Sequence, residues 1–329
     1  MLHLFRSFLK NCKDPSDFLE DLSIIATFTN GRLGNQISSF ATLFGLSKII
    51  GSEIRPGLIY DQFKELSDYF PYFENHYIKF LIHSWYCGHF CKLRWIEPKG
   101  LNIQQQNYDD IVNLTKVIGK FFSKGHAFYL PNYLNEPKIY LPFLEEIRTM
   151  FQLRQNYVKS AQEIINNASK TDPEVPEYSA IIGIHIRLTD YKDHLWKKNS
   201  KLIGMKFYKK AIQYFRQMYK RPLFLVVSDD KKQSIKTVIE PLNDKDVKFV
   251  GTIDEGISGI LTKEETVGID FGILTLCDHL IISHGTFGLW AALLSKDVEK
   301  VHIMADNEVS EEVQSMKRAK SKFIFIDDK

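Results

Sequence analysis

The second half of the chain alternates between short apolar runs and longer stretches in which apolar and polar residues recur with a helical period. Short β-branched runs predict buried strands, and the amphipathic stretches predict helices that cover both faces of a sheet. The predicted strands are 180–186, 223–227, 247–250, 279–283 and 300–304, and the predicted helices are 205–219, 231–239, 264–276 and 287–294. The pattern therefore predicts a Rossmann-like α/β domain with a parallel sheet.

The first half of the chain shows one strand-then-helix pattern near its start and no second one after it. An apolar run over 23–28, a Thr-Asn-Gly turn and a helical pattern over 34–50 predict a strand, a turn and a helix. Residues 60–140 are rich in aromatic residues without a clean period, so we predict no elements there. A helix is predicted over 141–166, and the proline-rich, acidic stretch after it predicts a linker. We expect three parts: an amphipathic segment (1–22), an N-terminal domain (23–170) and a C-terminal Rossmann-like domain (171–329).

Composition narrows the class of protein. With 329 residues, 44% hydrophobic and 25% charged, the chain has the make-up of an ordinary globular protein. The charge balance is 43 − 40 = +3 without a long run of one sign, so no nucleic-acid partner is expected and an anionic ligand must be bound locally. Four cysteines are too few for a disulfide framework. No apolar stretch reaches the ~20 residues that span a bilayer, so no transmembrane anchor is expected.

Polar residues follow the predicted strands at the edge where parallel sheets bind ligands. His185 and Arg187 alternate onto one face at the end of the first C-terminal strand. The planar guanidinium suits phosphate oxygens, although an arginine here also fits a structural pair with a carboxylate. Ser228 and Asp229 end the next strand, where a carboxylate either accepts from a ring N–H or a ribose hydroxyl, or caps the following helix.

Two glycine turns supply further candidate groups. In Gly285-Thr286-Phe287-Gly288 the first glycine permits a tight turn, and the N–H groups that open the next helix form a potential anion site. An ordinary strand–turn–helix junction has the same pattern. In the first half, Arg32, Asn35 and Gln36 place a dense set of hydrogen-bond donors at the turn after the first strand.

Taken together and in this order, the motifs resemble those of the galactoside 2-α-L-fucosyltransferases of glycosyltransferase family 11. The segments that carry the resemblance are Asn30-Gly-Arg-Leu-Gly-Asn-Gln36, His185-Ile-Arg-Leu-Thr-Asp-Tyr191, Ser228-Asp-Asp230, Asp270-Phe-Gly-Ile-Leu-Thr-Leu-Cys277 and Gly285-Thr-Phe-Gly-Leu-Trp-Ala-Ala292. The resemblance spans roughly residues 23–306. It implies a GT-B-like fold of two Rossmann-like lobes, with the nucleotide-sugar site in the C-terminal lobe facing the interdomain cleft. It also implies a place in the Golgi lumen or membrane.

The resemblance further implies an activity: inverting, metal-independent transfer of L-fucose from GDP-fucose to the 2-hydroxyl of a terminal β-galactoside on a glycan, without a cofactor. His185, Arg187 and Asp190 then belong to the guanosine-diphosphate pocket, the 285–288 turn holds the pyrophosphate, and Arg32 and Asn35 line the opposing wall with Gln36. Arg187, Asp190 and Arg32 are the expected catalytic residues, with Asp190 as the hypothetical general base. Leu188 stands where the family motif has a second arginine.

Other functions and sites remain open on these residues. The departure at Leu188 also fits a catalytically weak or silent GDP-sugar-binding relative, and a third alternative is a carbohydrate-binding module. Asp244-Lys-Asp246 has the D-x-D spacing of metal-dependent glycosyltransferases, but its polar surroundings favour a solvated surface turn. Cys87 and Cys91, with His83 and His89, match no standard zinc spacing, so we expect no metal site.

Overall fold

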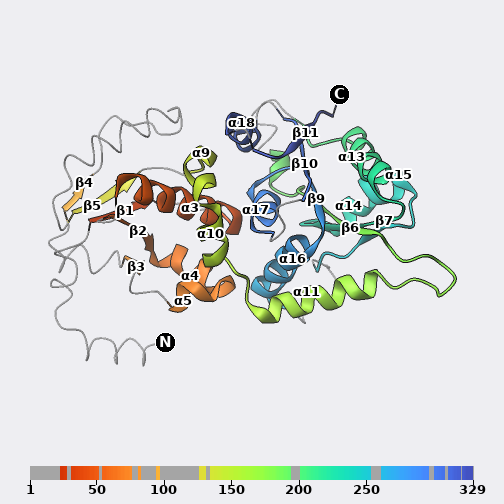
Figure 1. Ribbon diagram of the computed structural model, residues 1–329, viewed down its shortest axis with the longest axis horizontal. Coiled ribbons are helices and arrows are strands. Elements are labelled where there is room, and N and C mark those ends of the chain that lie inside the picture. Colours follow the sequence, from red (N-terminus) through yellow and green to blue (C-terminus); the bar gives the residue numbers. More distant parts are fainter. Residues whose placement is uncertain are drawn as a thin grey trace. The chain divides into compact units, whose positions relative to one another are not determined.

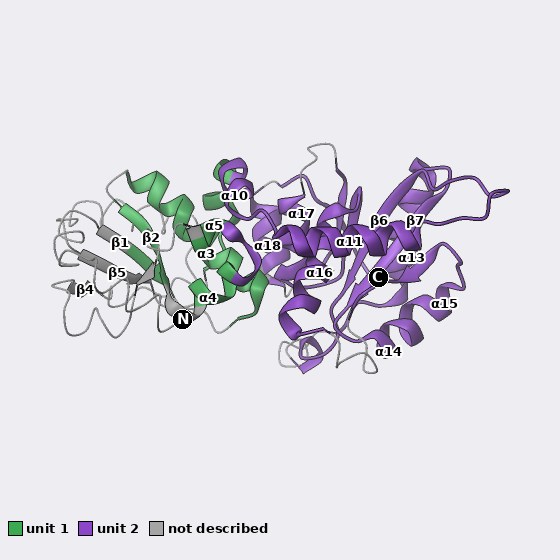
Figure 2. Ribbon diagram, turned by 90° about the horizontal axis from the view of Figure 1, so that it is seen from below, with its two compact units in different colours: residues 1–67, 72–143 green, residues 68–71, 144–329 purple. Residues whose placement is uncertain are grey.

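The chain folds into two units, each built on its own parallel sheet (Figure 1). The computed structural model describes residues 23–27, 31–51, 54–75, 81–82, 94–96, 126–130, 134–193, 201–252, 261–295, 300–307, 310–319 and 321–328. Figure 2 colours unit 1, Met1–Ser67 with Tyr72–Phe143, and unit 2, Asp68–Pro71 with Leu144–Lys329. The expected α/β architecture of two Rossmann-like lobes, the GT-B-like fold, is confirmed.

Unit 1 contains a five-stranded sheet in the order β3-β2-β1-β5-β4, in which every pair is parallel. The strands are β1 (Ser23–Thr27), β2 (Ile54–Ile59), β3 (Leu81–Ile82), β4 (Arg94–Ile96) and β5 (His126–Leu130). The helices are α3 (Leu33–Ile50), α4 (Tyr60–Tyr69), α5 (Pro71–Asn75), α9 (Pro137–Tyr140) and the 3₁₀ turn η2 (Leu141–Phe143). The strand–turn–helix predicted at the start is β1 and α3. The other four strands, of two to six residues, were not predicted.

Helix α3 forms the core of unit 1 because nearly all of its surface is covered. Ile37 and Phe40 are fully buried, and the Phe40 ring meets the Phe73 ring edge to face with centroids 4.9 Å apart. The buried Thr42 hydroxyl bonds within the unit: Oγ1 donates to the Ser38 carbonyl at 2.9 Å and accepts from the Glu136 N–H at 3.3 Å. The glycine turn before α3 is therefore anchored to a rigid element.

Unit 2 contains a six-stranded parallel sheet in the order β11-β10-β9-β6-β7-β8. The strands are β6 (Ala180–Ile186), β7 (Pro222–Ser228), β8 (Val247–Phe249), β9 (His279–Ile282), β10 (His302–Ala305) and β11 (Ile324–Ile326). The helices are α10 (Leu144–Met150), α11 (Gln155–Ala168), α13 (Met205–Met218), α14 (Lys231–Ser234) with the π turn η3 (Ile235–Ile239) and α15 (Glu240–Leu242), α16 (Lys263–Leu276), α17 (Thr286–Leu294) and α18 (Glu311–Arg318).

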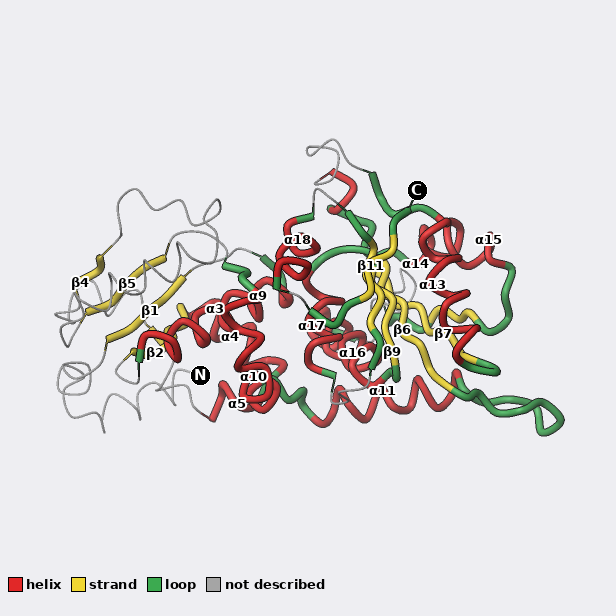
Figure 3. Tube along the Cα trace, turned by 45° about the horizontal axis from the view of Figure 1, so that its top comes forward, coloured by secondary structure: helices red, strands yellow, loops and turns green. Residues whose placement is uncertain are grey.

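Helices cover both faces of the unit 2 sheet (Figure 3), and strand alternation on β6 directs successive side chains to opposite faces. Ile182, Ile184 and Ile186 join the apolar cluster that α13 completes on one face. On the other face His185 packs against α17, where a Cβ atom built at Gly288 would lie 2.7 Å from the ring. The same alternation continues beyond the end of β6, so Arg187 and Leu188 also lie on opposite faces.

The division between the units falls between residues 143 and 144, not near residue 170 as the linker composition suggested. Helix α11 packs along α16 and belongs to unit 2, so the proline-rich stretch after it is a connection within that unit. The helix expected over 141–166 is also interrupted after Met150. Arg154 donates from its backbone N–H to the Tyr69 carbonyl and from Nε to the Asp68 carbonyl, both at 3.0 Å, and this contact occupies the break.

The last helix and strand complete unit 2: α18 buries Val313 and Met316, and β11 adds an edge strand to the sheet. None of the helices in the described ranges is long and apolar enough to cross a membrane. The amphipathic segment expected over residues 1–22 lies outside the described residues.

Candidate functional site

Three chain segments meet at the carboxyl edge of the unit 2 sheet. In the strand register His185 lies beside Val227 of β7 and Ile282 of β9, so the residues after these strands emerge side by side. The Arg187 N–H donates to Ser283 Oγ at 3.1 Å, and the Ser283 N–H donates to the His185 carbonyl at 3.1 Å. The structure thus brings together the predicted residues 185–190, 228–229 and 285–288 within one unit.

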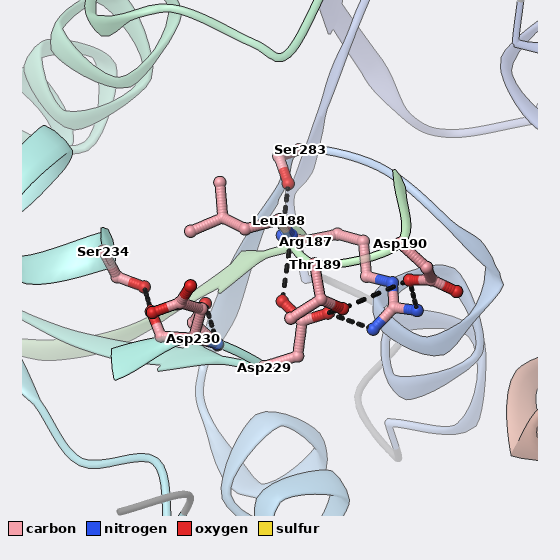
Figure 4. A network of polar contacts seen from close by, with 9 residues as sticks. Arg187, Leu188, Thr189, Asp190, Asp229, Asp230, Ser234 and Ser283 are labelled. Carbon is pink, nitrogen blue, oxygen red and sulfur yellow. Dashed lines mark hydrogen bonds and ion pairs between the residues drawn. The ribbon is translucent and has the colours of Figure 1, made fainter. Parts of the chain in front are cut away.

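Arg187 lies at this edge between two carboxylates (Figure 4). Its guanidinium donates through one terminal nitrogen to Asp229 and through the other to Asp190. Asp229 also accepts from the Leu188 N–H at 2.9 Å and from Thr189 Oγ1 at 2.5 Å. Arg187 therefore forms the structural pair with a carboxylate that the sequence analysis gave as an alternative. The predicted contact between Arg187 and a phosphate stays a prediction. The role of Asp190 as general base also stays a prediction.

The two acids that follow β7 have separate roles. Asp230 is the N-cap of α14 and accepts from the Gln233 N–H at 2.8 Å, which leaves Asp229 for the arginine. Ser228 is buried, and its hydroxyl accepts from the Asp230 N–H at 3.2 Å. Helix capping, which the sequence analysis considered for Asp229, thus falls to its neighbour.

Leu188 points away from the polar edge. It packs against the apolar cluster beneath α13, on the face opposite Arg187. The position of the family's second arginine is thus occupied by an apolar side chain in apolar surroundings.

His185 is buried beneath the 285–288 turn. Its ring lies 5.4 Å from the Phe287 ring, and Gly288 leaves just enough room for the imidazole. Burial lowers the pKa of His185 to about 4, which the Asp229 carboxylate offsets only in part, so the ring is neutral at physiological pH. Nδ1 has no hydrogen-bond partner among the described residues. The structure places this side chain as support for the turn, and its predicted nucleotide contact is untested.

The turn itself requires glycine at its first position. Gly285 has φ 82°, a left-handed conformation that side chains other than glycine adopt only with strain. It is the N-cap of α17, and no side-chain hydrogen bond caps this helix among the described residues. Tyr191 stacks on the His284 ring with centroids 4.8 Å apart and lies beside Gly285. The opening of α17 is therefore next to the motif that carries Arg187.

Asp270 is a buried acid near the same edge to which the sequence analysis assigned no role. Its Oδ1 accepts from the Thr252 N–H at 2.8 Å and from Thr252 Oγ1 at 3.0 Å. Burial raises the pKa of this carboxyl group to about 7, although both hydrogen bonds act in the opposite direction. The signal in the sequence is a single acid within the apolar part of α16. Through its hydrogen bonds to Thr252, Asp270 links α16 to the residues that follow β8.

Arg32, Asn35 and Gln36 lie together at the start of α3 in unit 1. The Arg32 carbonyl accepts from the Asn35 N–H at 2.8 Å and the Gln36 N–H at 3.2 Å. Gln36 is buried and its Nε2 donates to the Gly31 carbonyl at 2.9 Å, so much of its function is to hold the turn. Arg32 is exposed. The role of these residues on a wall opposite the nucleotide stays a prediction.

The D-x-D acids are engaged with cations. Asp244 pairs with Arg216, and Asp246 accepts from Arg221 at 3.4 Å and from the Tyr178 hydroxyl at 3.1 Å. The part of the chain that the structure describes contains no group of three or more His, Cys, Asp or Glu side chains arranged to hold a metal. The candidate cluster of His83, Cys87, His89 and Cys91 lies outside the described residues.

Comparisons with known proteins identify relatives of this chain in sequence and in fold. Galactoside alpha-(1,2)-fucosyltransferase 1 of Rattus norvegicus is 31% identical over 152 residues, which are 46% of this chain but only 37% of that relative. Galactoside alpha-(1,2)-fucosyltransferase 2 of Pongo pygmaeus is 28% identical over 271 residues, 80% of this chain and 67% of the relative. The solved structure of POFUT1 in complex with GDP-fucose shares the fold with a TM-score of 0.52 at 10% identity, covering 84% of this chain and 94% of that one. Residues 9–326 match the family described as Glycosyl transferase family 11, and the chain belongs to this family.

Proposed function

We propose that the chain transfers L-fucose from GDP-fucose to the 2-hydroxyl of a terminal β-galactoside, with inversion and without a metal ion. Membership of family 11 and the names of the galactoside fucosyltransferase relatives support the reaction class. The observation that carries the proposal is the position of Arg187, at the carboxyl end of β6 and hydrogen-bonded to Ser283 just before the opening of α17.

Departure of a nucleoside diphosphate requires groups that stabilise the charge developing on its terminal phosphate. The Arg187 guanidinium can supply a charge-assisted hydrogen bond, worth about 1.5–3 kcal/mol. The first N–H groups of α17 add oriented dipoles that favour an anion. Together these groups give the leaving diphosphate a site built only from protein donors, which is why the proposal includes no metal ion.

The test is a transfer assay on the purified chain with GDP-fucose and a free β-galactoside such as lactose. Release of GDP that depends on the acceptor, with an α-1,2 linkage in the product by NMR, supports the proposal, and unchanged activity in excess chelator supports the metal-independent route. Binding of GDP without acceptor-dependent release would favour the silent relative. Failure to bind GDP in a titration would favour the carbohydrate-binding module.

A weak or silent relative is the second candidate because of Leu188. Its side chain packs against the apolar cluster, so no cation from this position supports Arg187. The turnover number in the transfer assay separates the two candidates. The place in the Golgi is likewise a proposal, tested by imaging the tagged full-length protein in cells.

A further inference from the structure

The two carboxylates that contact Arg187 disfavour the binding of an anion at its guanidinium. One guanidinium contacts the carboxylates of Asp190 and Asp229, so this group of three carries a net charge of −1 (Figure 4). A diphosphate that approached Arg187 would meet both carboxylates as well as the cation. Like charges at close range disfavour binding by several-fold or more, so one carboxylate must give way.

The two carboxylates are held very differently. The Asp229 side chain is 13% exposed and accepts from three donors: Arg187, the Leu188 N–H and Thr189 Oγ1. The Asp190 side chain is 59% exposed, and its Oδ1 accepts from Arg187 and, at 3.2 Å, from Thr189 Oγ1. Moving Asp229 would break a backbone hydrogen bond inside the turn, whereas Asp190 can rotate into water. The Arg187 side chain itself is only 14% exposed, so it is less free to move than Asp190.

We propose that Asp190 is an intramolecular competitor of the donor's diphosphate for Arg187, and that Asp229 is the positioning residue that keeps the guanidinium at the sheet edge when Asp190 is displaced. This inference rests on the proposed function, because it takes the diphosphate of a nucleotide sugar as the anion at Arg187. The diphosphate takes the guanidinium nitrogen that Asp190 occupies. After transfer, Asp190 returns to Arg187 and favours release of the nucleotide product.

The experiment is a calorimetric titration of the full chain with GDP, comparing the wild type with Asp190→Asn. We expect the variant to bind GDP about tenfold more tightly, because the competing charge is gone and the guanidinium is less strongly engaged. Asp190→Glu, which keeps the charge, should return the affinity towards that of the wild type. Asp193→Asn is the matched control, since Asp193 is an exposed acid three residues further on; we expect its effect to stay within twofold.

A double variant separates competition from simple repulsion. If Asp190 acts through Arg187, Asp190→Asn should bring no gain in GDP affinity when Arg187 is already alanine, whereas a general charge effect would bring the same gain in both backgrounds. Unchanged or weaker GDP binding by Asp190→Asn overturns the competitor role while leaving the donor assignment intact. Absence of GDP binding by the wild type overturns the donor assignment and the competitor role with it.

The positioning role of Asp229 has its own readout. Asp229→Asn should raise the KM for GDP-fucose about tenfold and leave the KM for the galactoside acceptor unchanged. A general loss of structure would raise both constants and lower the melting temperature together, and that result would overturn the role. The melting curve by circular dichroism is recorded for every variant.

Discussion

The close approach of α17 to β6 makes Gly288→Ala the most informative single substitution for the geometry of the site. A Cβ atom at this position would lie 2.7 Å from His185 Nδ1 and 3.0 Å from both His185 Cγ and Ile282 Cγ2. Favourable contacts between such atoms begin near 3.5 Å, so the new methyl group overlaps three atoms at once. His185 is buried, so its ring has little room to move away from the new methyl group.

We expect Gly288→Ala to lower the free energy of unfolding by about 1–3 kcal/mol, the usual cost of overpacking a core. The higher helix propensity of alanine returns up to about 1 kcal/mol, so the net loss lies towards the lower end. For a unit of this size each kcal/mol corresponds to a fall of roughly 2–4 °C in melting temperature. The assay is urea unfolding followed by tryptophan fluorescence, to which the buried Trp290 of α17 contributes.

The double variant His185→Ala with Gly288→Ala tests the cause of this loss. If the clash with the ring is responsible, the two substitutions together should cost at least 0.5 kcal/mol less than the sum of their separate effects, roughly the threshold at which coupling is resolved. A Gly288→Ala protein as stable as the wild type, or strictly additive effects, would refute the packing of His185 against α17.

Three further predictions concern the same unit. Asp270→Asn should stabilise the protein at pH 8 but not at pH 5. An acid whose pKa is raised from 3.8 to about 7 binds more protons in the folded than in the unfolded state between these pH values, so the stability of the wild type falls with rising pH by up to about 1.4 kcal/mol per pH unit. Melting temperatures measured across this pH range should depend less on pH in the variant. Leu188→Arg should destabilise the protein by about 2–4 kcal/mol without raising transfer activity, because the charge enters the apolar cluster under α13; a stable, more active variant would contradict that placement. Gly285→Ala should cost about 1–2 kcal/mol because φ is 82° there, and equal stability in urea would show that the turn adopts another conformation.

Much of unit 2 could be predicted from the sequence because its signals are local. The strand predicted over 180–186 is β6 to the residue, and the helices expected over 205–219 and 264–276 match α13 and α16 within a residue at each end. Long buried strands between amphipathic helices leave a clear change of period at every boundary. The same alternation explains why Arg187 and Leu188 lie on opposite faces.

The elements that were missed depend on partners distant in the chain. The break between α10 and α11 coincides with Arg154 binding the carbonyls of Asp68 and Tyr69, which lie 86 positions or so earlier. Helix α11 belongs to unit 2 because it packs against α16. Its own composition does not indicate which unit it packs against. The short strands of unit 1 and β11 exist because a neighbouring strand pairs with them.

The sequence by itself determined which chemical groups stand at the ends of the strands, because alternation and glycine turns act over a few residues. It placed a guanidinium after β6, acids after β7 and a glycine before α17. Only the tertiary structure decided that Asp229 rather than Asp230 pairs with Arg187, and that His185 lies beneath the turn. Contacts of that kind depend on strand order and register, which join residues about 40 or more positions apart and leave no periodic trace in the chain.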